Sequence, residues 1–276
     1  MLPLAGIRIV NLSANLPGPE AARRLQLLGA EVVKVEAPSG DPMELYQAQW
    51  YRDLAVGQRV VRLDLKSEAG RAELDGLLGA ADLLISATRP AAMERLGLGW
   101  QALHERYPRL CMVAITGYPA PRENEAGHDL TYQAALGLLT PPHMPRTLLA
   151  DMAGAEQTIS AALALLLGRE RVQTAGYAEV PLSAAAAALA QPLAYGCTVA
   201  GANLGGGIPE YNIYQARQGW VAVAALEPHF KDRLESALGI ATPDEYRQVF
   251  REKSAPEWQR WAQERDIPLT ALADPC

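Results

Sequence analysis

The feature that most constrains this fold is an alternation of short β-branched runs with helical stretches through the first 116 residues. Residues 6–12 and 31–36 predict buried strands. Between them, Pro19 stands where the first turn of a helix tolerates proline, so residues 20–28 predict a helix, which Gly29 ends. A strand, a helix and a strand in this order form a βαβ unit, which implies a parallel sheet with a right-handed crossover.

The alternation continues beyond this unit. Further strands are predicted at residues 60–65, 81–86 and 110–116. A helix capped by Ser67 is expected as far as residue 78, and another is expected at 96–107. This half of the chain therefore predicts an open α/β domain built on a parallel sheet.

The rest of the chain predicts a different organisation. Residues 148–167 read as a buried helix whose only charged residues, Asp151 and Glu156, lie near its start. Residues 180–209 carry no charge, but they are rich in alanine, serine and glycine, so a buried helix followed by a glycine loop is expected rather than a membrane span. A hairpin at 211–215 and 220–224, followed by helices at 230–238 and 256–265, predicts a smaller second domain.

Charge and cysteine content exclude several classes of protein. Acidic residues outnumber basic ones by 31 to 25, so the formal net charge is −6 and nucleic acid is not an expected partner. Cys111, Cys197 and Cys276 lack the spacing of a disulfide scaffold or a zinc site, so no metal is expected. The first residues lack the basic and apolar regions of a signal peptide, so the default expectation is a cytoplasmic protein.

The turn after the first predicted strand bears on cofactors. Residues 13–18 lack the GxGxxG pattern, so neither nicotinamide nor flavin is supported. A helix N-terminus that follows a parallel strand still offers unpaired N–H groups to an anion. A ligand that carries phosphate is therefore compatible with this turn.

The residues best suited to catalysis are His128, Asp129, Asp151 and Glu227. Removing a proton next to a thioester carbonyl requires a base, an acid on the opposite face, and donors where the enolate oxygen develops. An ordinary imidazole has a pKa of about 6.5, and a carboxyl group in an apolar pocket can be tuned toward the same range. On residue types alone, a His-Asp pair is more often a surface turn or a helix cap, so both interpretations stay open.

Several short blocks stand in order along almost the whole chain. They are Pro3-Leu-Ala-Gly-Ile-Arg8, Gly29-Ala-Glu-Val-Val-Lys-Val-Glu36, Leu63-Asp-Leu-Lys-Ser67, Arg89-Pro90, Glu94-Arg-Leu-Gly-Leu-Gly99 and Ile115-Thr-Gly117. Together they resemble the family III CoA-transferases (CaiB/BaiF), and more closely the α-methylacyl-CoA racemase branch. The segment Ala126-Gly-His-Asp-Leu-Thr-Tyr132 is similar to the racemase version of the active-site segment.

This resemblance implies roles for four residues. Asp129 is similar to the aspartate that carries the acyl group as a mixed anhydride in the transferases. His128 matches the racemase histidine that acts as a base, and Leu148-Leu-Ala-Asp151 resembles the segment with the second base. Glu227 resembles a racemase glutamate that pairs with the histidine and holds its tautomer.

The resemblance also implies an acyl-CoA thioester as substrate, with no permanently bound cofactor. By the same analogy, the CoA nucleotide and pantetheine would lie along Leu63, Asp64, Lys66 and Arg89. The segment that contains Gly205, Gly206, Gly207 and Tyr211 resembles the glycine segment that approaches the thioester. The expected partner is therefore a small acyl-CoA molecule, with neither nucleic acid nor membrane.

The architecture expected from all these features is α/β. An open parallel, Rossmann-like, CoA-binding domain is expected over residues 1–180, and a linker helix with a smaller α+β domain over 181–276. Relative to typical members the C-terminus, at Cys276, is shortened, and the segment that follows in those members helps form an interlocked homodimer.

Three functions are compatible with these features. The favoured one is racemase-like epimerisation at Cα of a 2-substituted acyl-CoA. A CoA-transferase that uses Asp129 as nucleophile is the first alternative. The second is a diverged, non-catalytic paralogue, which the shortened loops at 117–127 and 140–147 suggest.

Overall fold

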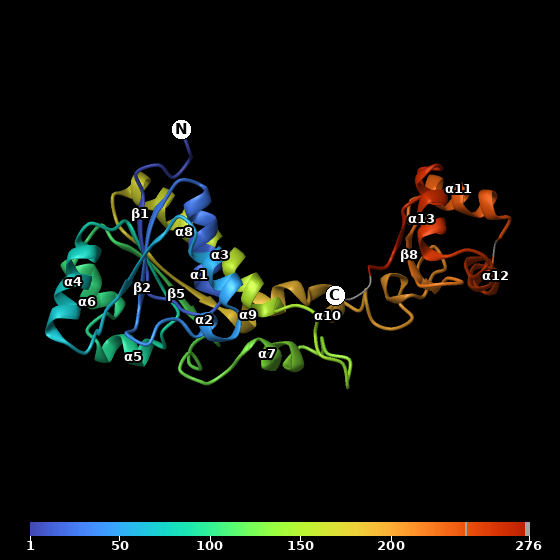
Figure 1. The fold of residues 1–276 in the computed structure, drawn as a ribbon. Helices are drawn as coiled ribbons and strands as arrows, with labels where there is room; N and C mark the ends of the chain where they lie inside the picture. Colours follow the sequence, from blue (N-terminus) through green and yellow to red (C-terminus); the bar gives the residue numbers. More distant parts are fainter. Residues whose placement is uncertain (241, 274–276) are drawn as a thin grey trace. The chain divides into compact units, whose positions relative to one another are not determined.

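The computed structural model describes residues 1–240 and 242–273 (Figure 1). Contacts divide the chain into two compact units, residues 1–190 and 191–276. The boundary lies at 190/191, whereas the sequence analysis places it at 180/181. Cys111 is buried, Cys197 is exposed, and Cys276 lies outside the described residues.

A six-stranded parallel sheet forms the centre of the first unit (Figure 1). Its strands are β1 (Arg8–Asn11), β2 (Glu31–Glu36), β3 (Arg59–Arg62), β4 (Leu83–Ser86), β5 (Cys111–Thr116) and β6 (Tyr177–Pro181). They lie in the order β3-β2-β1-β4-β5-β6, and each neighbouring pair is parallel. This is the doubly wound order, which reverses between β1 and β4. The α/β, Rossmann-like architecture expected from the sequence is confirmed.

Helices cover both faces of this sheet (Figure 1). The helices of the first unit are α1 (Pro17–Leu27), α2 (Pro42–Tyr46), α3 (Ala48–Ala55), α4 (Glu68–Gly79), α5 (Pro90–Arg95), α6 (Trp100–Arg106), α7 (Asp129–Ala135), α8 (Leu149–Val172) and α9 (Leu182–Leu189). On β4, Ile85 packs in the core layer of α1 and α8, and its neighbour Leu84 packs in that of α4 and α6. Successive side chains of a strand point to opposite faces, so a strand buried on both faces is apolar throughout.

Local signals explain where several elements begin and end. The Ser67 hydroxyl accepts a hydrogen bond from the Gly70 N–H at 3.0 Å, which confirms it as the cap of α4. The helix expected at 96–107 is α6, but it begins only at Trp100, because the chain turns at Gly97, where φ is 69°. Val180 belongs to β6 rather than to a buried helix, and α9 begins only at Leu182.

The second unit is a small α+β structure. Its antiparallel sheet has the order β7 (Tyr211–Gln215), β8 (Trp220–Ala224) and β9 (Leu269–Ala271). Its helices are α10 (Gln191–Ala194), α11 (Pro228–Leu238), α12 (Pro243–Val249) and α13 (Ala255–Gln263), with short 3-10 turns at Asn203–Gly205 and Phe250–Glu252. Trp258, Phe250 and Tyr246 are fully buried in its core. The predicted hairpin is confirmed, whereas α12 and β9 were not expected from the sequence.

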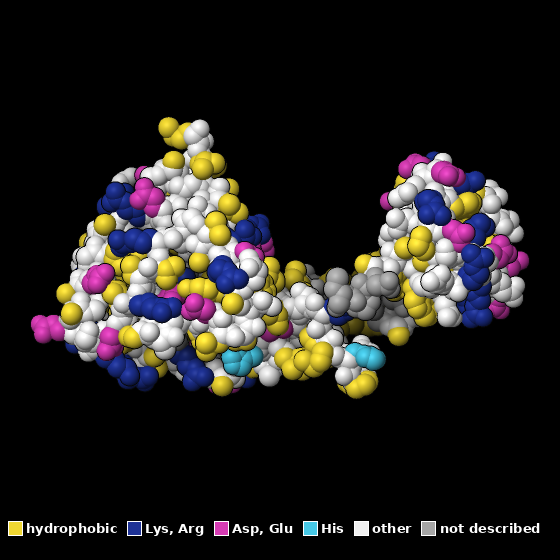
Figure 2. Space-filling model, in the orientation of Figure 1, with side chains coloured by type: hydrophobic (Ala, Val, Ile, Leu, Met, Phe, Trp, Pro, Cys, Tyr) yellow, Lys and Arg dark blue, Asp and Glu magenta, His cyan; other side chains and the backbone are white. Residues whose placement is uncertain are grey.

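Surface composition and element lengths bear on possible partners. On the face of the first unit drawn in Figure 2, basic and acidic side chains are interspersed. Of the helices in the described ranges, none combines the length and the apolar character that crossing a membrane requires. Across residues 1–240 and 242–273, no three His, Cys, Asp or Glu side chains gather in a way that could hold a metal ion.

Candidate functional site

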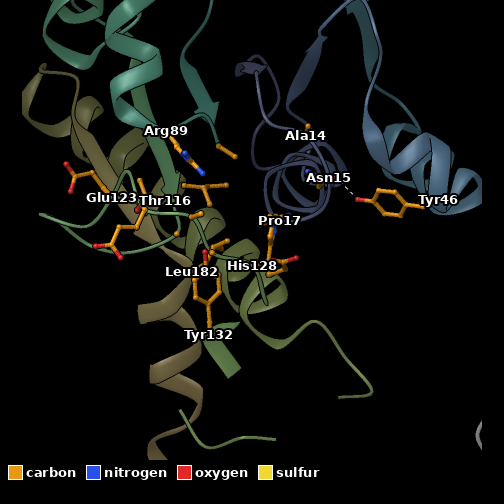
Figure 3. A pocket seen from close by; sticks show the side chains of 17 residues that line it. Ala14, Asn15, Pro17, Tyr46, Arg89, Thr116, Glu123, His128, Tyr132 and Leu182 are labelled. Atoms are coloured by element: carbon orange, nitrogen blue, oxygen red, sulfur yellow. Dashed lines mark hydrogen bonds between the residues drawn. The ribbon is translucent and has the colours of Figure 1, made fainter. Parts of the chain in front are cut away.

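A cavity of about 500 Å³ opens where β1, β4 and β5 end (Figure 3). Its wall includes Asn15 after β1, Arg89 after β4 and Gly117 after β5. In a doubly wound sheet, ligands bind beyond the carboxyl ends of the strands, at the point where the strand order reverses. The cavity therefore occupies the position at which this fold binds ligands.

His128 and Asp151 line this cavity from two different helices. His128 is the N-cap residue of α7, and Asp151 lies in the first turn of α8. Burial, followed by the negative charge of Asp129, raises the pKa of Asp151 to about 6, although His128 acts in the opposite direction. The pKa of Asp151 thus lies close to the ordinary value for an imidazole, about 6.5.

The backbone of His128 is held at the start of α7. The Thr131 hydroxyl accepts a hydrogen bond from the His128 N–H at 3.1 Å and donates one to the His128 carbonyl at 2.7 Å. The residue is exposed, and it lines the cavity. A fixed backbone next to an accessible side chain places the imidazole where a ligand in the cavity can meet it.

Asp129 performs a different task from its neighbour. Its side chain is buried and does not line the cavity. The carboxylate accepts hydrogen bonds from the backbone N–H groups of Ala150 at 2.6 Å and Asp151 at 3.2 Å, and from Gln133 Nε2 at 2.6 Å. Since the first N–H groups of a helix have no partner within the helix, Asp129 caps α8 and fixes the turn that carries Asp151.

A second cavity, of about 440 Å³, lies beside the first on the same edge of the sheet. Leu63, Asp64 and Lys66, which follow β3, line it. In the loop after β4, Thr88 lines the second cavity and Arg89 lines the first, so this loop separates the two. Three of the four residues predicted to contact CoA thus line the second cavity, and Arg89 lines the first, together with His128 and Asp151.

The other residues singled out by sequence lie in the second unit. Glu227 is the exposed residue that precedes α11. Gly205, Gly206 and Tyr211 line a cavity of about 460 Å³ within this unit. At Gly207, an added Cβ would lie 2.2 Å from the Gly201 carbonyl oxygen, so the turn itself requires glycine.

Sequence reasoning missed several polar residues of the first cavity, among them Asn15, Tyr46 and Tyr132 (Figure 3). The Tyr46 hydroxyl donates a hydrogen bond to Asn15 Oδ1 at 2.6 Å, which joins α2 to the loop after β1. That contact spans 31 positions and leaves no periodic signal in the sequence. Tyr132 could have been found, because it follows His128 by four residues and such a spacing places side chains on one helix face.

Known proteins match this chain over most of its length. A family model described as CoA-transferase family III matches residues 4–266. The chain belongs to CoA-transferase family III. The resemblance found in the sequence blocks is confirmed.

Relatives of this CoA-transferase family III protein include enzymes named for two different reactions. Human alpha-methylacyl-CoA racemase is 31% identical over 290 residues, covering 93% of this chain and 74% of the racemase. The succinyl-CoA–D-citramalate CoA-transferase of Chloroflexus aurantiacus is 30% identical over 192 residues, covering 64% of this chain and 48% of the transferase. The chain thus spans about half of that transferase and about three quarters of the racemase.

The fold of the family is shared across solved structures. The crystal structure of Rv3272 from Mycobacterium tuberculosis has a TM-score of 0.86 at 27% identity, covering 99% of this chain and 86% of that chain. A CAIB/BAIF family protein from Brucella suis, at 21% identity, has a TM-score of 0.83 and covers 99% of this chain and 84% of its own. The choice between a racemase and a transferase therefore rests on the geometry of His128, Asp129 and Asp151.

Proposed function

We propose that this protein epimerises the α-carbon of a 2-substituted acyl-CoA through an enolate, with His128 and Asp151 as the two bases. The proposal rests on one observation: both side chains line one cavity, and burial there raises the pKa of Asp151 to about 6. One group removes the α-proton, the electron pair of the C–H bond passes into the enolate, and the other group returns a proton to the opposite face. A carboxyl group with a pKa of about 6 can remove a proton in one direction and return it in the other.

The two cavities suit the two ends of a CoA thioester. In this proposal, the nucleotide lies along Leu63, Asp64 and Lys66, and the thioester reaches the cavity of His128 past Arg89. No step requires a metal or a redox cofactor, because the thioester carbonyl itself acidifies the α-proton.

We also propose that the protein acts in the cytoplasm as a homodimer. The first residues of the second unit expose three large apolar side chains, Tyr195, Val199 and Leu204. A short segment that exposes several large apolar side chains is typical of protein interfaces. Gel filtration with light scattering tests the oligomeric state.

The geometry of Asp129 favours the racemase over the transferase. A nucleophilic carboxylate must reach the acyl carbon, but that of Asp129 is buried and accepts three hydrogen bonds, two of them from N–H groups at the start of α8. An acyl anhydride on Asp129 would break these bonds and leave the first N–H groups of α8 unpaired. A base on Asp151 requires no such rearrangement.

Deuterium incorporation tests the proposed function. A 2-methylacyl-CoA incubated with the protein in deuterated water, without an acceptor acid, is expected to gain deuterium at Cα and to lose optical purity. Mass spectrometry and chiral chromatography measure the two changes. A protein that incorporates no deuterium, but yields a hydroxamate at Asp129 when acyl-CoA and hydroxylamine are added together, would be a transferase instead.

The pH dependence follows from the pKa of Asp151. Asp151 must be ionised to remove a proton, so kcat/KM for the enantiomer that it deprotonates is expected to fall about tenfold per pH unit below a pH of about 6. For the other enantiomer, Asp151 must be protonated as the acid, so the rate falls as pH rises above about 6. Initial rates for each pure enantiomer between pH 4.5 and 8.5 check this, and identical profiles for the two would contradict it.

A further inference from the structure

Tyr132 places a hydroxyl group in the first cavity that the two-base mechanism does not use (Figure 3). Its side chain is 1% exposed, and its ring packs edge-on against that of Tyr118, with 5.2 Å between the ring centroids. The hydroxyl has no hydrogen-bond acceptor within residues 1–240 and 242–273. Buried tyrosine hydroxyls usually have a partner, so a free one that faces a cavity marks a position where a ligand atom can accept a hydrogen bond.

Two glycines leave room for this hydroxyl beside the backbone. A Cβ added to Gly117 would lie 2.5 Å from the Tyr132 hydroxyl oxygen, and one added to Gly127 would lie 2.6 Å from it. Both backbones therefore pass directly beside the hydroxyl and leave room for it only because they carry no side chain. With the ring buried as well, the oxygen is fixed before any ligand arrives, as electrostatic stabilisation of a developing charge requires.

The surroundings of the hydroxyl keep it protonated. Burial is the main cause that raises the pKa of Tyr132 to about 12, and Tyr118, Asp151 and Asp129 add to it, whereas Arg89 opposes it. A group in this state donates a hydrogen bond and cannot act as a third base at neutral pH. Asp151 lines the same cavity, but no hydrogen bond joins its carboxyl group to the Tyr132 hydroxyl. The hydroxyl is therefore available to donate to an oxygen atom of a ligand.

We propose that Tyr132 donates a hydrogen bond to the thioester oxygen of the bound acyl-CoA and stabilises the enolate that forms there. The inference rests on the proposed function. The α-proton passes to His128 or Asp151, the electron pair of the C–H bond forms the Cα=C bond, and the carbonyl π pair moves onto the oxygen. Tyr132 keeps its own proton throughout, and the hydrogen bond shortens as negative charge collects on the acceptor.

The test replaces Tyr132 by phenylalanine, which keeps the ring and removes only the hydroxyl. Loss of one donor to a developing oxyanion is expected to lower kcat for epimerisation and for deuterium incorporation about 100-fold, with KM and Tm close to those of the parent protein. Tyr118→Phe is the matched control, because Tyr118 packs against Tyr132 but does not line the cavity; it is expected to keep the parent kcat. An S-alkyl-CoA thioether, which has no carbonyl oxygen, should bind equally to the parent and to Tyr132→Phe.

The possible outcomes separate this inference from the proposed function. If the parent protein incorporates no deuterium, the proposed function fails; if it does and Tyr132→Phe matches it, only the role of Tyr132 is wrong. If Tyr132 donates to the enolate, the pH–rate profile of Tyr132→Phe should keep its midpoint near pH 6. A profile with a shifted midpoint and an unchanged maximal rate would mean that Tyr132 acts through Asp151, and it would overturn the inference. Gly117→Ala provides a second variant, expected to lower kcat by crowding the hydroxyl out of position while the phenol is retained.

Discussion

Replacing Asp151 by asparagine is expected to lower the rate of epimerisation by about 100- to 10,000-fold while the protein stays folded. Asparagine matches the size of the aspartate side chain but can neither accept nor return a proton at the α-carbon. The enantiomer that His128 deprotonates should still exchange its α-proton for deuterium, without inversion, because the acid for the opposite face is missing. Chiral separation of the deuterated product, starting from each pure enantiomer, measures how much exchange occurs with inversion and how much without.

Two further variants give this prediction its controls. His128→Gln should show the reverse pattern, in which only the opposite enantiomer exchanges. Glu156→Gln alters a carboxylate on the same helix that is exposed and pairs with Arg24 at 2.8 Å, so its activity should equal that of the parent. If Asp151→Asn epimerised at the parent rate, the two-base mechanism would have to be abandoned.

Asp151→Asn is also expected to stabilise the fold at neutral pH. The pKa of Asp151 is raised by burial to about 6 in the folded protein, against an ordinary value of 3.8. The folded state therefore binds more protons than the unfolded state between these values, and the contribution of Asp151 to stability is lost as pH rises through that window. Asp151→Asn should consequently have a higher Tm than the parent above pH 6 and the same Tm below pH 4. A variant that is inactive and yet more stable cannot owe its inactivity to unfolding.

The strands show how far the sequence predicts this fold. The bounds of β2 are those expected, because its three valines form a β-branched run that Gly29 precedes and Pro38 follows. The last strand, β6, was missed because it lies at the edge of the sheet, exposes Tyr177 and Glu179, and ends in Pro181. An edge strand needs only part of the apolar pattern, and its proline costs no ladder bond on the open side. Such a strand is defined by its neighbour rather than by its own residues.

The candidate site also combines features that the sequence predicts with features that only the tertiary contacts determine. His128 and Asp151 could be proposed from residue type and from the resemblance, because the chemistry demands groups of this kind. The capping of α8 by Asp129 could not, since it joins positions 21 apart through the packing of α7 against α8. The raised pKa of Asp151 depends on that same packing, because burial is its main cause. Sequence indicates which groups are available, whereas the tertiary contacts decide which one caps a helix and which one faces the cavity.

Replacing Lys34 by methionine is expected to destabilise the protein by about 3–5 kcal/mol. The Lys34 side chain is 2% exposed, and its Nζ lies 3.0 Å from a Glu36 carboxylate oxygen and 2.6 Å from one of Asp41. Methionine fills a similar volume but leaves the buried Asp41 carboxylate without its cation, and Glu36 keeps only Arg62, at 3.4 Å. An unpaired buried charge costs far more than a lost surface contact. Urea denaturation measures the change in the free energy of unfolding.

The control lies on the same strand. Glu31, at the exposed end of β2, pairs with Arg8 at 3.7 Å, and Glu31→Gln should cost at most about 1 kcal/mol because water and salt screen this pair. If Lys34→Met lost less than about 1 kcal/mol of unfolding free energy, the buried ion pairs would not be what stabilises this region.

The same ion pairs are connected to the cavity wall. Because the Asp41 carboxylate also accepts a hydrogen bond from the Asn15 N–H at 3.0 Å, Lys34→Met should loosen this wall and raise KM for acyl-CoA in the fraction that stays folded. The interactions that stabilise the sheet edge thus also position the loop against which the substrate is proposed to bind.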